Sequence, residues 1–194
     1  MTEFPNWFLG INAPEFFERY LATKKLDEIH CLQIGAYTGD ASIWLAENIL
    51  INPKSTLTDV DTWGGSNEPA HDMLDWSEVE QAYDAKTLSY RESGRIIKKK
   101  MTSDEFFAST ESQKLFDFIY VDGDHEAVPV LRDGMNAIEV LKIGGVLAFD
   151  DYYWDPGQGP AFRPRPAIDA VLACYSNRLS VLEIERQVWL VKTA

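Results

Sequence analysis

The stretch that decides the fold runs from Phe116 to Trp154, FDFIYVDGDHEAVPVLRDGMNAIEVLKIGGVLAFDDYYW. Its two apolar runs, FDFIYV and GGVLAF, have the length and the aromatic and branched composition of strands that are buried on both faces. Between them, leucine, methionine and isoleucine residues recur at helical spacing from 131 to 141, and a glycine pair follows. This order predicts a βαβ unit with a right-handed crossover, so both strands end at the same edge of one sheet.

Ionisable side chains follow both strands of this unit. Asp122, Asp124 and His125 come after the first strand, and Asp150 and Asp151 come after the second. Open α/β sheets bind ligands at the edge where these strands end, so we expect these residues to gather at one site. Neighbouring carboxylates repel one another unless they are protonated, solvated or neutralised by a cation. Alternatively, some of them only cap a helix or a turn, and we assign Asp124 to such a cap.

The rest of the chain supplies further elements of the same architecture. HCLQI, STLTDVD and RIIKK are typical of buried strands, and helices are predicted over residues 13–27, packed on the sheet edge, and over 41–51. Capping-box patterns at Ser77/Glu80 and Thr102/Glu105 predict two more helix starts, and 166–175 is also helical. LSVLEIERQVWLVK predicts an antiparallel hairpin. We therefore expect an α/β fold of five parallel β/α units closed by a terminal hairpin, with helices on both faces, in one domain spanning 1–194.

Three segments fall outside the strands of this plan. Residues 1–27 form an N-terminal helical segment, and the polar, glycine-bearing residues 64–76 are either a lid over a ligand or a surface loop. His71 lies in that second segment, where we expect a solvated surface histidine. Residues 152–166 form a proline- and glycine-rich loop that is too constrained for a helix or a central strand.

Charge and composition exclude several classes of protein. The 194 residues carry 18 Lys and Arg against 31 Asp and Glu, a formal net charge of −13. A nucleic-acid partner is not expected, because recognition through phosphates needs clustered basic residues, and Lys98–Lys100 is read as a solvated strand end. No apolar run reaches membrane-spanning length and no leader pattern opens the sequence. A soluble, cytoplasmic enzyme or binding domain without a membrane partner is the expectation, and a homo-oligomer is compatible with it.

The glycine turn GAYTG at 35–39, which follows HCLQI, indicates which kind of ligand the site binds. Turns that bind pyrophosphate have a second glycine where this turn has Tyr37, so close approach of a pyrophosphate is disfavoured. Asp61 ends the second strand, where an acid can accept hydrogen bonds from both ribose hydroxyls. Its alternative role is that of a turn residue. Together the turn and the acid favour a ligand with a ribose and no phosphate.

LQIGAYTGDASIWLA, LTDVDTWGGS, FIYVDGDH and LKIGGVLAFDDYYW together resemble a small class I S-adenosylmethionine-dependent methyltransferase. The resemblance spans about residues 28–192, and is to the group related to macrolide-sugar O-methyltransferases and, more distantly, to catechol O-methyltransferase. It implies a Rossmann-like sheet and S-adenosylmethionine as cofactor. It also implies O-methylation of a small hydroxylated acceptor, such as a sugar, a phenol or a related metabolite, assisted by Mg²⁺ or by Ca²⁺ or Mn²⁺.

The resemblance also implies a set of cofactor-binding residues. The methionine part of the cofactor would be wrapped by Gly35, Ala36, Tyr37 and Gly39. The ribose would be held by Asp61, with Thr62 and Trp63 beside it, and the adenine would be touched by Ser103. The remaining cofactor-binding residues would be Gln33, Ser42 and Asp122. Two positions depart from the family pattern. Gln33 replaces the usual acid and could bind the cofactor's ammonium through its amide oxygen. Ala41 stands where the family has Ser or Thr, and Ser42 follows it.

On the acceptor side, the resemblance implies that Asp122, Asp150 and Asp151 bind the metal. It also implies that His125 and Asp122 are catalytic residues, with His125 acting as the general base. A capping or supporting role for His125, and a cap role for Asp151, are the alternatives. The loop 152–166 would cover the acceptor, and its Trp154, Phe162, Arg163 and Arg165 suit a ring-bearing or anionic acceptor, unless the arginines only pair with nearby acids. A metal-independent methyltransferase, an NAD(P)-binding oxidoreductase and a non-catalytic cofactor-binding domain stay open as alternative functions.

Overall fold

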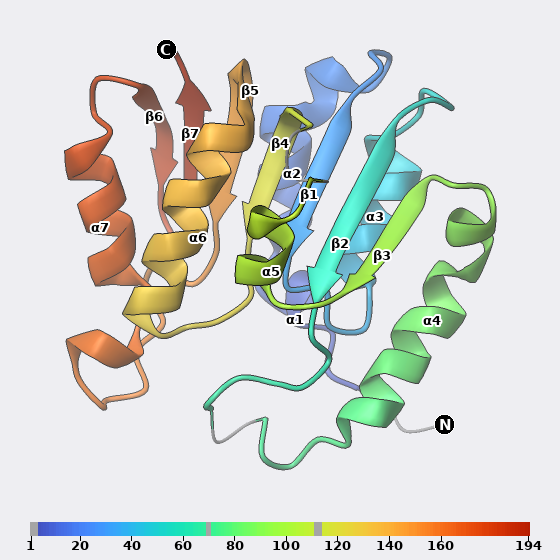
Figure 1. The fold of residues 1–194 in the computed structure, drawn as a ribbon, viewed down its shortest axis with the longest axis horizontal. Coiled ribbons are helices and arrows are strands. Elements are labelled where there is room, and N and C mark those ends of the chain that lie inside the picture. The colour runs from blue at the N-terminus through green and yellow to red at the C-terminus, as the bar shows by residue number, and fades with distance from the viewer. Residues whose placement is uncertain (1–3, 69–70, 111–113) are drawn as a thin grey trace.

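The computed structural model describes residues 4–68, 71–110 and 114–194. Within these residues, the strands form one seven-stranded sheet in the order β3-β2-β1-β4-β5-β7-β6 (Figure 1). The parallel strands are β1 (His30–Ile34), β2 (Thr56–Asp61), β3 (Ile96–Lys100), β4 (Phe116–Val121) and β5 (Leu141–Phe149). β7 (Val188–Lys192) is antiparallel to β5 and to β6 (Leu179–Ile184). The predicted parallel sheet with a terminal hairpin is confirmed.

Helices cover both faces of the sheet, as predicted. α5 (Ser103–Ala108), α6 (Ala127–Val140) and α7 (Arg165–Cys174) lie on the face toward the viewer in Figure 1, and α2 (Ala13–Leu21) and α3 (Asp40–Asn48) lie behind it. α4 (Trp76–Glu92) flanks β3, and the short α1 (Trp7–Gly10) precedes α2. Short 3₁₀ turns span Ala22–Lys24 and Pro160–Phe162. No helix of the described residues is both long and apolar enough to cross a membrane.

The N-terminal helix lies elsewhere than predicted. It ends at Leu21 and packs on the middle of the sheet rather than on its edge. The ring of Phe17 is 4.9 Å from that of Tyr120 on β4 and 5.2 Å from that of Trp189 on β7, measured between centroids. Burial of several aromatic side chains there outweighs any contact available at an edge strand.

The start of α4 also corrects the sequence-based prediction. Asp75, and not Ser77, caps this helix, because its Oδ1 accepts hydrogen bonds from the backbone N–H of Ser77 at 2.9 Å and of Glu78 at 3.4 Å. Glu80 does not cap the helix, and its side chain instead contacts Lys98 of β3. The capping box predicted at Thr102 and Glu105 is present at the start of α5.

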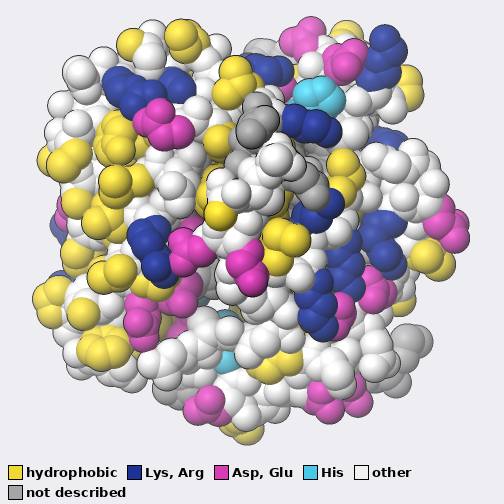
Figure 2. Space-filling view, in the orientation of Figure 1, with side chains coloured by type: hydrophobic (Ala, Val, Ile, Leu, Met, Phe, Trp, Pro, Cys, Tyr) yellow, Lys and Arg dark blue, Asp and Glu magenta, His cyan; other side chains and the backbone are white. Residues whose placement is uncertain are grey.

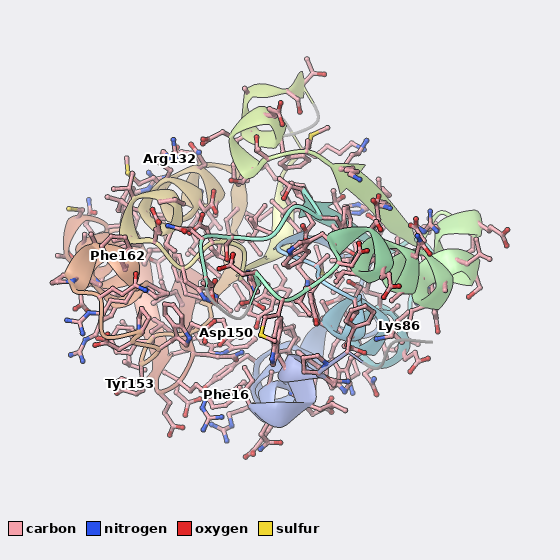
Figure 3. All side chains as sticks on the ribbon, turned by 90° about the horizontal axis from the view of Figure 1, so that it is seen from below. Phe16, Lys86, Arg132, Asp150, Tyr153 and Phe162 are labelled. Atoms are coloured by element: carbon pink, nitrogen blue, oxygen red, sulfur yellow. The ribbon has the colours of Figure 1, made fainter. Side chains whose placement is uncertain are left out.

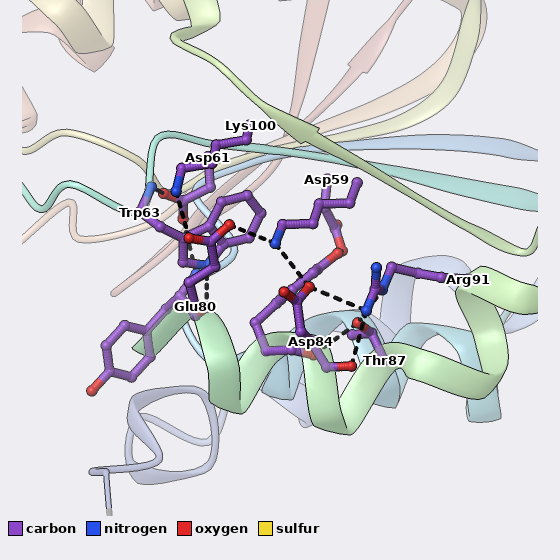
Figure 4. A network of polar contacts seen from close by, with 11 residues as sticks. Asp59, Asp61, Trp63, Glu80, Asp84, Thr87, Arg91 and Lys100 are labelled. Atoms are coloured by element: carbon purple, nitrogen blue, oxygen red, sulfur yellow. Dashed lines mark hydrogen bonds and ion pairs between the residues drawn. The ribbon is translucent and has the colours of Figure 1, made fainter. Parts of the chain in front are cut away.

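The basic strand β3 is held by acids of α4 (Figure 4). Lys98 Nζ lies 2.7 Å from Glu80 Oε1 and 2.8 Å from Asp84 Oδ1, and 4.4 Å from the centroid of the Trp63 ring. Its neighbour Lys100 pairs with Glu80 as well. The prediction of a solvated strand end is therefore wrong for Lys98, whose ammonium is inside an ion-pair network.

Asp59, inside β2, is a fully buried acid near this network. Its Oδ2 accepts a hydrogen bond from the Tyr83 hydroxyl at 2.7 Å. Burial raises the pKa of Asp59 to about 7, although the hydrogen bond from Tyr83 opposes the rise. Ionisation of Asp59 therefore costs folding free energy.

We expect Asp59→Asn to gain stability relative to the unmodified protein as the pH rises. The folded pKa of about 7 lies above the unfolded value of about 3.9. The folding free energy that Asp59 costs therefore increases from about pH 4 to about pH 7 and is constant above pH 7. The gain should reach up to about 4 kcal/mol between pH 4 and pH 8, measured by urea unfolding. The exposed Asp72→Asn serves as control and should show no pH-dependent gain. An equal stability difference at both pH values would contradict the prediction.

Candidate functional site

A cavity of about 530 Å³ opens at the carboxyl edge of the parallel strands, a size typical of small-molecule sites. Its walls come from the ends of β1, β2, β4 and β5, from α1, and from residues in the segments 65–68, 71–76 and 101–104. In the space-filling view, acidic side chains flank a hollow in the lower half of the molecule, and a histidine is visible inside it (Figure 2). The cavity thus opens at the carboxyl edge of the parallel strands, and its role as a ligand site stays a prediction.

One carboxylate ties the glycine turn to the end of β2. Asp61 Oδ2 accepts hydrogen bonds from the backbone N–H of Ala36 at 2.7 Å and of Tyr37 at 3.0 Å, and Oδ1 accepts from Trp63 N–H at 2.7 Å. Gly35, at φ +86°, lies against β4, because a Cβ atom added to it would be 2.0 Å from the carbonyl oxygen of Asp122. The turn is therefore fixed between two strand ends.

Gln33, at the end of β1, has an unsatisfied polar atom. The side chain is only 2% exposed, and its Nε2 donates to the carbonyl oxygen of Gly35 at 2.7 Å. Its amide oxygen is buried without a hydrogen-bond partner among the described residues, and the residue lines the cavity. Because a buried acceptor without a donor is costly, this atom fits a ligand that brings an N–H group.

At the acidic end of the cavity, His125 lies between two carboxylates. Its Nε2 is 2.8 Å from Asp151 Oδ2, and its Nδ1 is 3.0 Å from Glu68 Oε1. Burial disfavours the charged ring, but the ion pairs with Asp151 and Glu68 outweigh it and raise the pKa of His125 to about 11. In this arrangement the ring carries a proton on both nitrogens at neutral pH.

Asp122, His125 and Asp151 are close enough to share a cation. Within the described part of the chain they form one group whose donor atoms all lie within 4.8 Å of one another. Burial, and then the negative charges of Asp150 and Asp151, raise the pKa of Asp122 well above its usual range. This repulsion is the one expected from the sequence, with His125 as a third member of the group.

Asp150, the other predicted metal ligand, is engaged in bonds of its own. One carboxylate oxygen accepts hydrogen bonds from the Tyr120 hydroxyl and, at 3.2 Å, from Gln187 Nε2; the other accepts from the backbone N–H of Asp151 at 2.7 Å. Seen from below, Asp150 lies near the middle of the molecule (Figure 3). Burial and the charge of Asp151 raise its pKa. A metal-ligand role for Asp150 stays a prediction.

Most of the predicted cofactor-binding residues line the cavity. These are Gln33, Gly35, Ala36, Tyr37, Asp61, Thr62, Ser103 and Asp122. Gly39, Ser42 and Trp63 are not among the described residues that line it. Gly39 packs against Tyr83, Ser42 is buried near Asp59, and Trp63 is buried under Lys98.

The segment 64–76 contributes residues that the sequence did not single out; residues 69–70 of it lie outside the described ranges. Glu68 is buried against His125, and no local pattern could have indicated this. His71 was expected in solvent, but its Nδ1 is 2.7 Å from Ser66 Oγ and its ring lies between those of Trp7 and Trp76, at 5.7 and 4.9 Å. That prediction is wrong, because His71 lines the cavity and its side chain is only 13% exposed.

The loop 152–166 reaches the site through Trp154, whose ring centroid is 4.8 Å from that of His125. The arginines of the loop are engaged by nearby acids. Arg163 pairs with Asp155, and Arg165 lies 3.6 Å from Asp169. Of the two readings of these arginines, pairing with acids is the one seen.

Comparisons with known proteins agree on one type of domain. A family model described as a methyltransferase domain matches residues 32–152. The sequence has no significant match among curated proteins.

Similar solved structures share the fold at low identity. A proposed rRNA methylase from Clostridium thermocellum matches with a TM-score of 0.68 at 11% identity, over 100% of this chain and 99% of that one. The O-methyltransferase TomG from Streptomyces achromogenes is involved in tomaymycin synthesis and was solved with S-adenosylmethionine. It matches with a TM-score of 0.65 at 14% identity, over 93% of this chain and 80% of that one. The MycE methyltransferase of the mycinamycin pathway was solved with Mg and S-adenosylhomocysteine. It matches with a TM-score of 0.62 at 14% identity, over 99% of this chain and 51% of that one.

Proposed function

The chain belongs to the methyltransferase domain family, and from that premise we propose that it transfers the methyl group of S-adenosylmethionine to a hydroxyl of a small acceptor. The observation that carries the proposal is the buried, unpartnered amide oxygen of Gln33 beside the glycine turn. An ammonium group, which has N–H donors and no acceptor, complements that oxygen. A nicotinamide cofactor offers only neutral amide and amino N–H donors, whose hydrogen bonds are weaker than those of a charged ammonium, so Gln33 favours the methyl donor over an oxidoreductase.

The cofactor, when bound, supplies a methyl group on a positively charged sulfur. Gln33 would hold its ammonium, the turn at Gly35–Tyr37 its amino-acid part, and Asp61 its ribose. Asp150 and Asp151, whose charges contribute to the raised pKa of Asp122, would make this end of the cavity electronegative, which favours a cationic sulfur. These contacts are supported by the residues that line the cavity.

A hydroxyl acceptor must lose its proton, and His125 is the residue proposed to take it. Glu68 Oε1 lies 3.0 Å from Nδ1 and its negative charge would favour a proton there, which leaves Nε2 as the reactive nitrogen. While Nε2 donates to Asp151 the ring cannot accept a proton. His125 therefore becomes a base only when Asp151 is engaged by another positive charge.

We further propose that Asp122 and Asp151 hold Mg²⁺, or Ca²⁺ or Mn²⁺, with His125 and Asp150 nearby. Hard carboxylate oxygens suit these ions, and the mutual repulsion of the acids supports a cation there. A bound ion would lower the pKa of the acceptor hydroxyl and orient it. Residues 64–76 serve as the lid and 152–166, through Trp154, as the acceptor-side loop of this single domain. The free thiols of Cys31 and Cys174 support a reducing, cytoplasmic location.

Calorimetric titration with S-adenosylhomocysteine tests the proposal. We expect saturable binding with a dissociation constant in the range of about 1 μM to 1 mM, typical of enzyme ligands. NADH, titrated in parallel, should not bind. Binding of NADH without binding of S-adenosylhomocysteine would overturn the assignment.

Gln33→Leu should weaken S-adenosylhomocysteine binding by about 10-fold or more, because the leucine removes the acceptor for the ammonium. The effect is measured by calorimetry, alongside the melting temperature of the free protein. Gln81→Leu, an exposed position on α4, is the matched control and should bind as the unmodified protein does. Unchanged affinity in folded Gln33→Leu would remove Gln33 from the site.

A further inference from the structure

Gln187, the residue that precedes β7, is a buried amide to which the proposed chemistry gives no role. Its exposed fraction is 0%, and it is not among the described residues that line the cavity. β7 runs antiparallel beside β5 (Figure 1), and Val188 is paired with Phe149, so Gln187 stands opposite the point where Asp150 follows β5. A buried amide is costly unless its polar atoms are paired, so its partners indicate what it does.

The orientation of this amide is fixed by a tryptophan. The indole Nε1 of Trp189 donates to Gln187 Oε1 at 3.0 Å, and an indole N–H can only donate. The amide therefore directs its NH₂ away from Trp189, where Nε2 lies 3.2 Å from Asp150 Oδ2 and 3.2 Å from the Tyr120 hydroxyl. That hydroxyl in turn donates to Asp150 Oδ2. The network thus has one consistent set of donors and acceptors, and they converge on one carboxylate oxygen.

These bonds decide which part of Asp150 is left for a ligand. A carboxylate has about four acceptor sites, two on each oxygen. Oδ2 accepts from Gln187 and Tyr120, and Oδ1 accepts from the backbone N–H of Asp151 at 2.7 Å. Among the described residues this leaves one acceptor site, on Oδ1, of a side chain that lines the cavity.

The turn that contains Gln187 also holds the backbone on the far side of Asp150. Asp151, a member of the group that could share a cation, has a left-handed backbone at φ +58°, a conformation that costs free energy for a residue other than glycine. The N–H of the next residue, Tyr152, donates to the carbonyl oxygen of Arg186 at 2.9 Å. The acidic pair is therefore held at two points by the turn of the terminal hairpin.

We propose that Gln187 is a positioning residue of the acidic site, which holds the Asp150–Asp151 pair in the geometry that binds a divalent cation. The inference rests on the proposed function and deepens it, because it gives the terminal hairpin a part in that site. Stability alone does not require the amide, since replacing both partners of a buried hydrogen bond by apolar groups can be nearly neutral. Groups that orient metal ligands, by contrast, typically account for 10–100-fold in metal affinity.

Calorimetric titration of the full chain with MnCl₂ tests the inference. Gln187→Met removes the amide from a side chain of similar length and should weaken Mn²⁺ binding by about 10-fold or more. Tyr120→Phe removes the other side-chain donor to Asp150 and should weaken Mn²⁺ binding in the same way, so it also serves if Gln187→Met does not fold. Both variants should bind S-adenosylhomocysteine as the unmodified protein does, because Gln33 and Asp61 are unchanged.

Lys192→Met is the matched control, since it removes buried hydrogen bonds at the other end of β7. Its Nζ donates to the carbonyl oxygens of Ile138 and Leu141, each at 2.7 Å. This variant should have a lower urea midpoint but the Mn²⁺ affinity of the unmodified protein. An equal loss of Mn²⁺ affinity in Lys192→Met would refute the positioning role, because any destabilisation of β7 would then have the same effect.

The remaining outcomes separate this inference from the proposed function. Unchanged Mn²⁺ affinity in folded Gln187→Met or Tyr120→Phe would refute the positioning role while the proposed function stands. If the unmodified protein binds S-adenosylhomocysteine but not Mn²⁺, the metal site and the positioning role are both refuted, and the methyl donor is not. If it binds neither, the proposed function is refuted as well.

Discussion

Asp151→Ala is expected to weaken binding of Mg²⁺ or Mn²⁺ by about 100-fold or more. The variant loses one of three grouped donors, and loss of even a supporting partner of a metal ligand typically costs 10–100-fold. In the unmodified protein a saturating ion should raise the melting temperature, because a ligand at about 100 times its dissociation constant stabilises by about 2.7 kcal/mol. That increase should vanish in Asp151→Ala, as read by thermal unfolding with and without MnCl₂.

The control is Asp155→Ala, in the same loop, whose carboxylate pairs with Arg163. It should keep the metal-induced shift. Asp150→Ala tests whether Asp150 is a metal ligand or only a hydrogen-bond acceptor for Tyr120 and Gln187. Loss of the metal-induced shift would make Asp150 a ligand, and a retained shift would make it an acceptor only. If the unmodified protein shows no shift at all, the metal site is refuted and the methyltransferase is metal-independent.

Gly35→Ala is expected to cost more than about 5 kcal/mol of folding free energy, enough to unfold many domains at 37 °C. A Cβ atom at this position would lie 2.0 Å from the carbonyl oxygen of Asp122, so β1 and β4 would have to move apart. The residue also has φ +86°, which adds strain for any side chain. The measurement is the urea midpoint, or the yield of folded protein.

Gly144→Ala isolates the two causes. Gly144 has φ +78° but nothing within 4 Å of an added Cβ, so its substitution should cost only about 1 kcal/mol, the backbone strain alone. Similar costs at the two positions would show that the close approach of Gly35 to Asp122 does not determine stability.

The sheet could be predicted because its signal is local. Strands such as FDFIYV and GGVLAF are buried on both faces, and their composition follows directly from that burial. The glycine turn and Asp61 could be placed for the same reason, since each sits at the end of such a strand. The terminal hairpin needed only two β runs in close succession.

The remaining site residues depend on contacts that are distant in sequence. Glu68 follows β2 and His125 follows β4, so their 3.0 Å contact depends on the tertiary fold and not on a local pattern. Asp150 and Asp151 look equivalent in the sequence, but Asp151 takes a left-handed backbone conformation at φ +58°, and the two side chains have different partners.

The bonds of Asp61 have a consequence for the thermodynamics of binding. Its carboxylate accepts hydrogen bonds from the backbone of Ala36, Tyr37 and Trp63, and these bonds belong to the folded chain itself. The conformational entropy of ordering this turn is lost during folding, so it does not have to be lost again during association. A ligand meets a preorganised surface there, and its intrinsic contacts with the turn count in full toward its affinity.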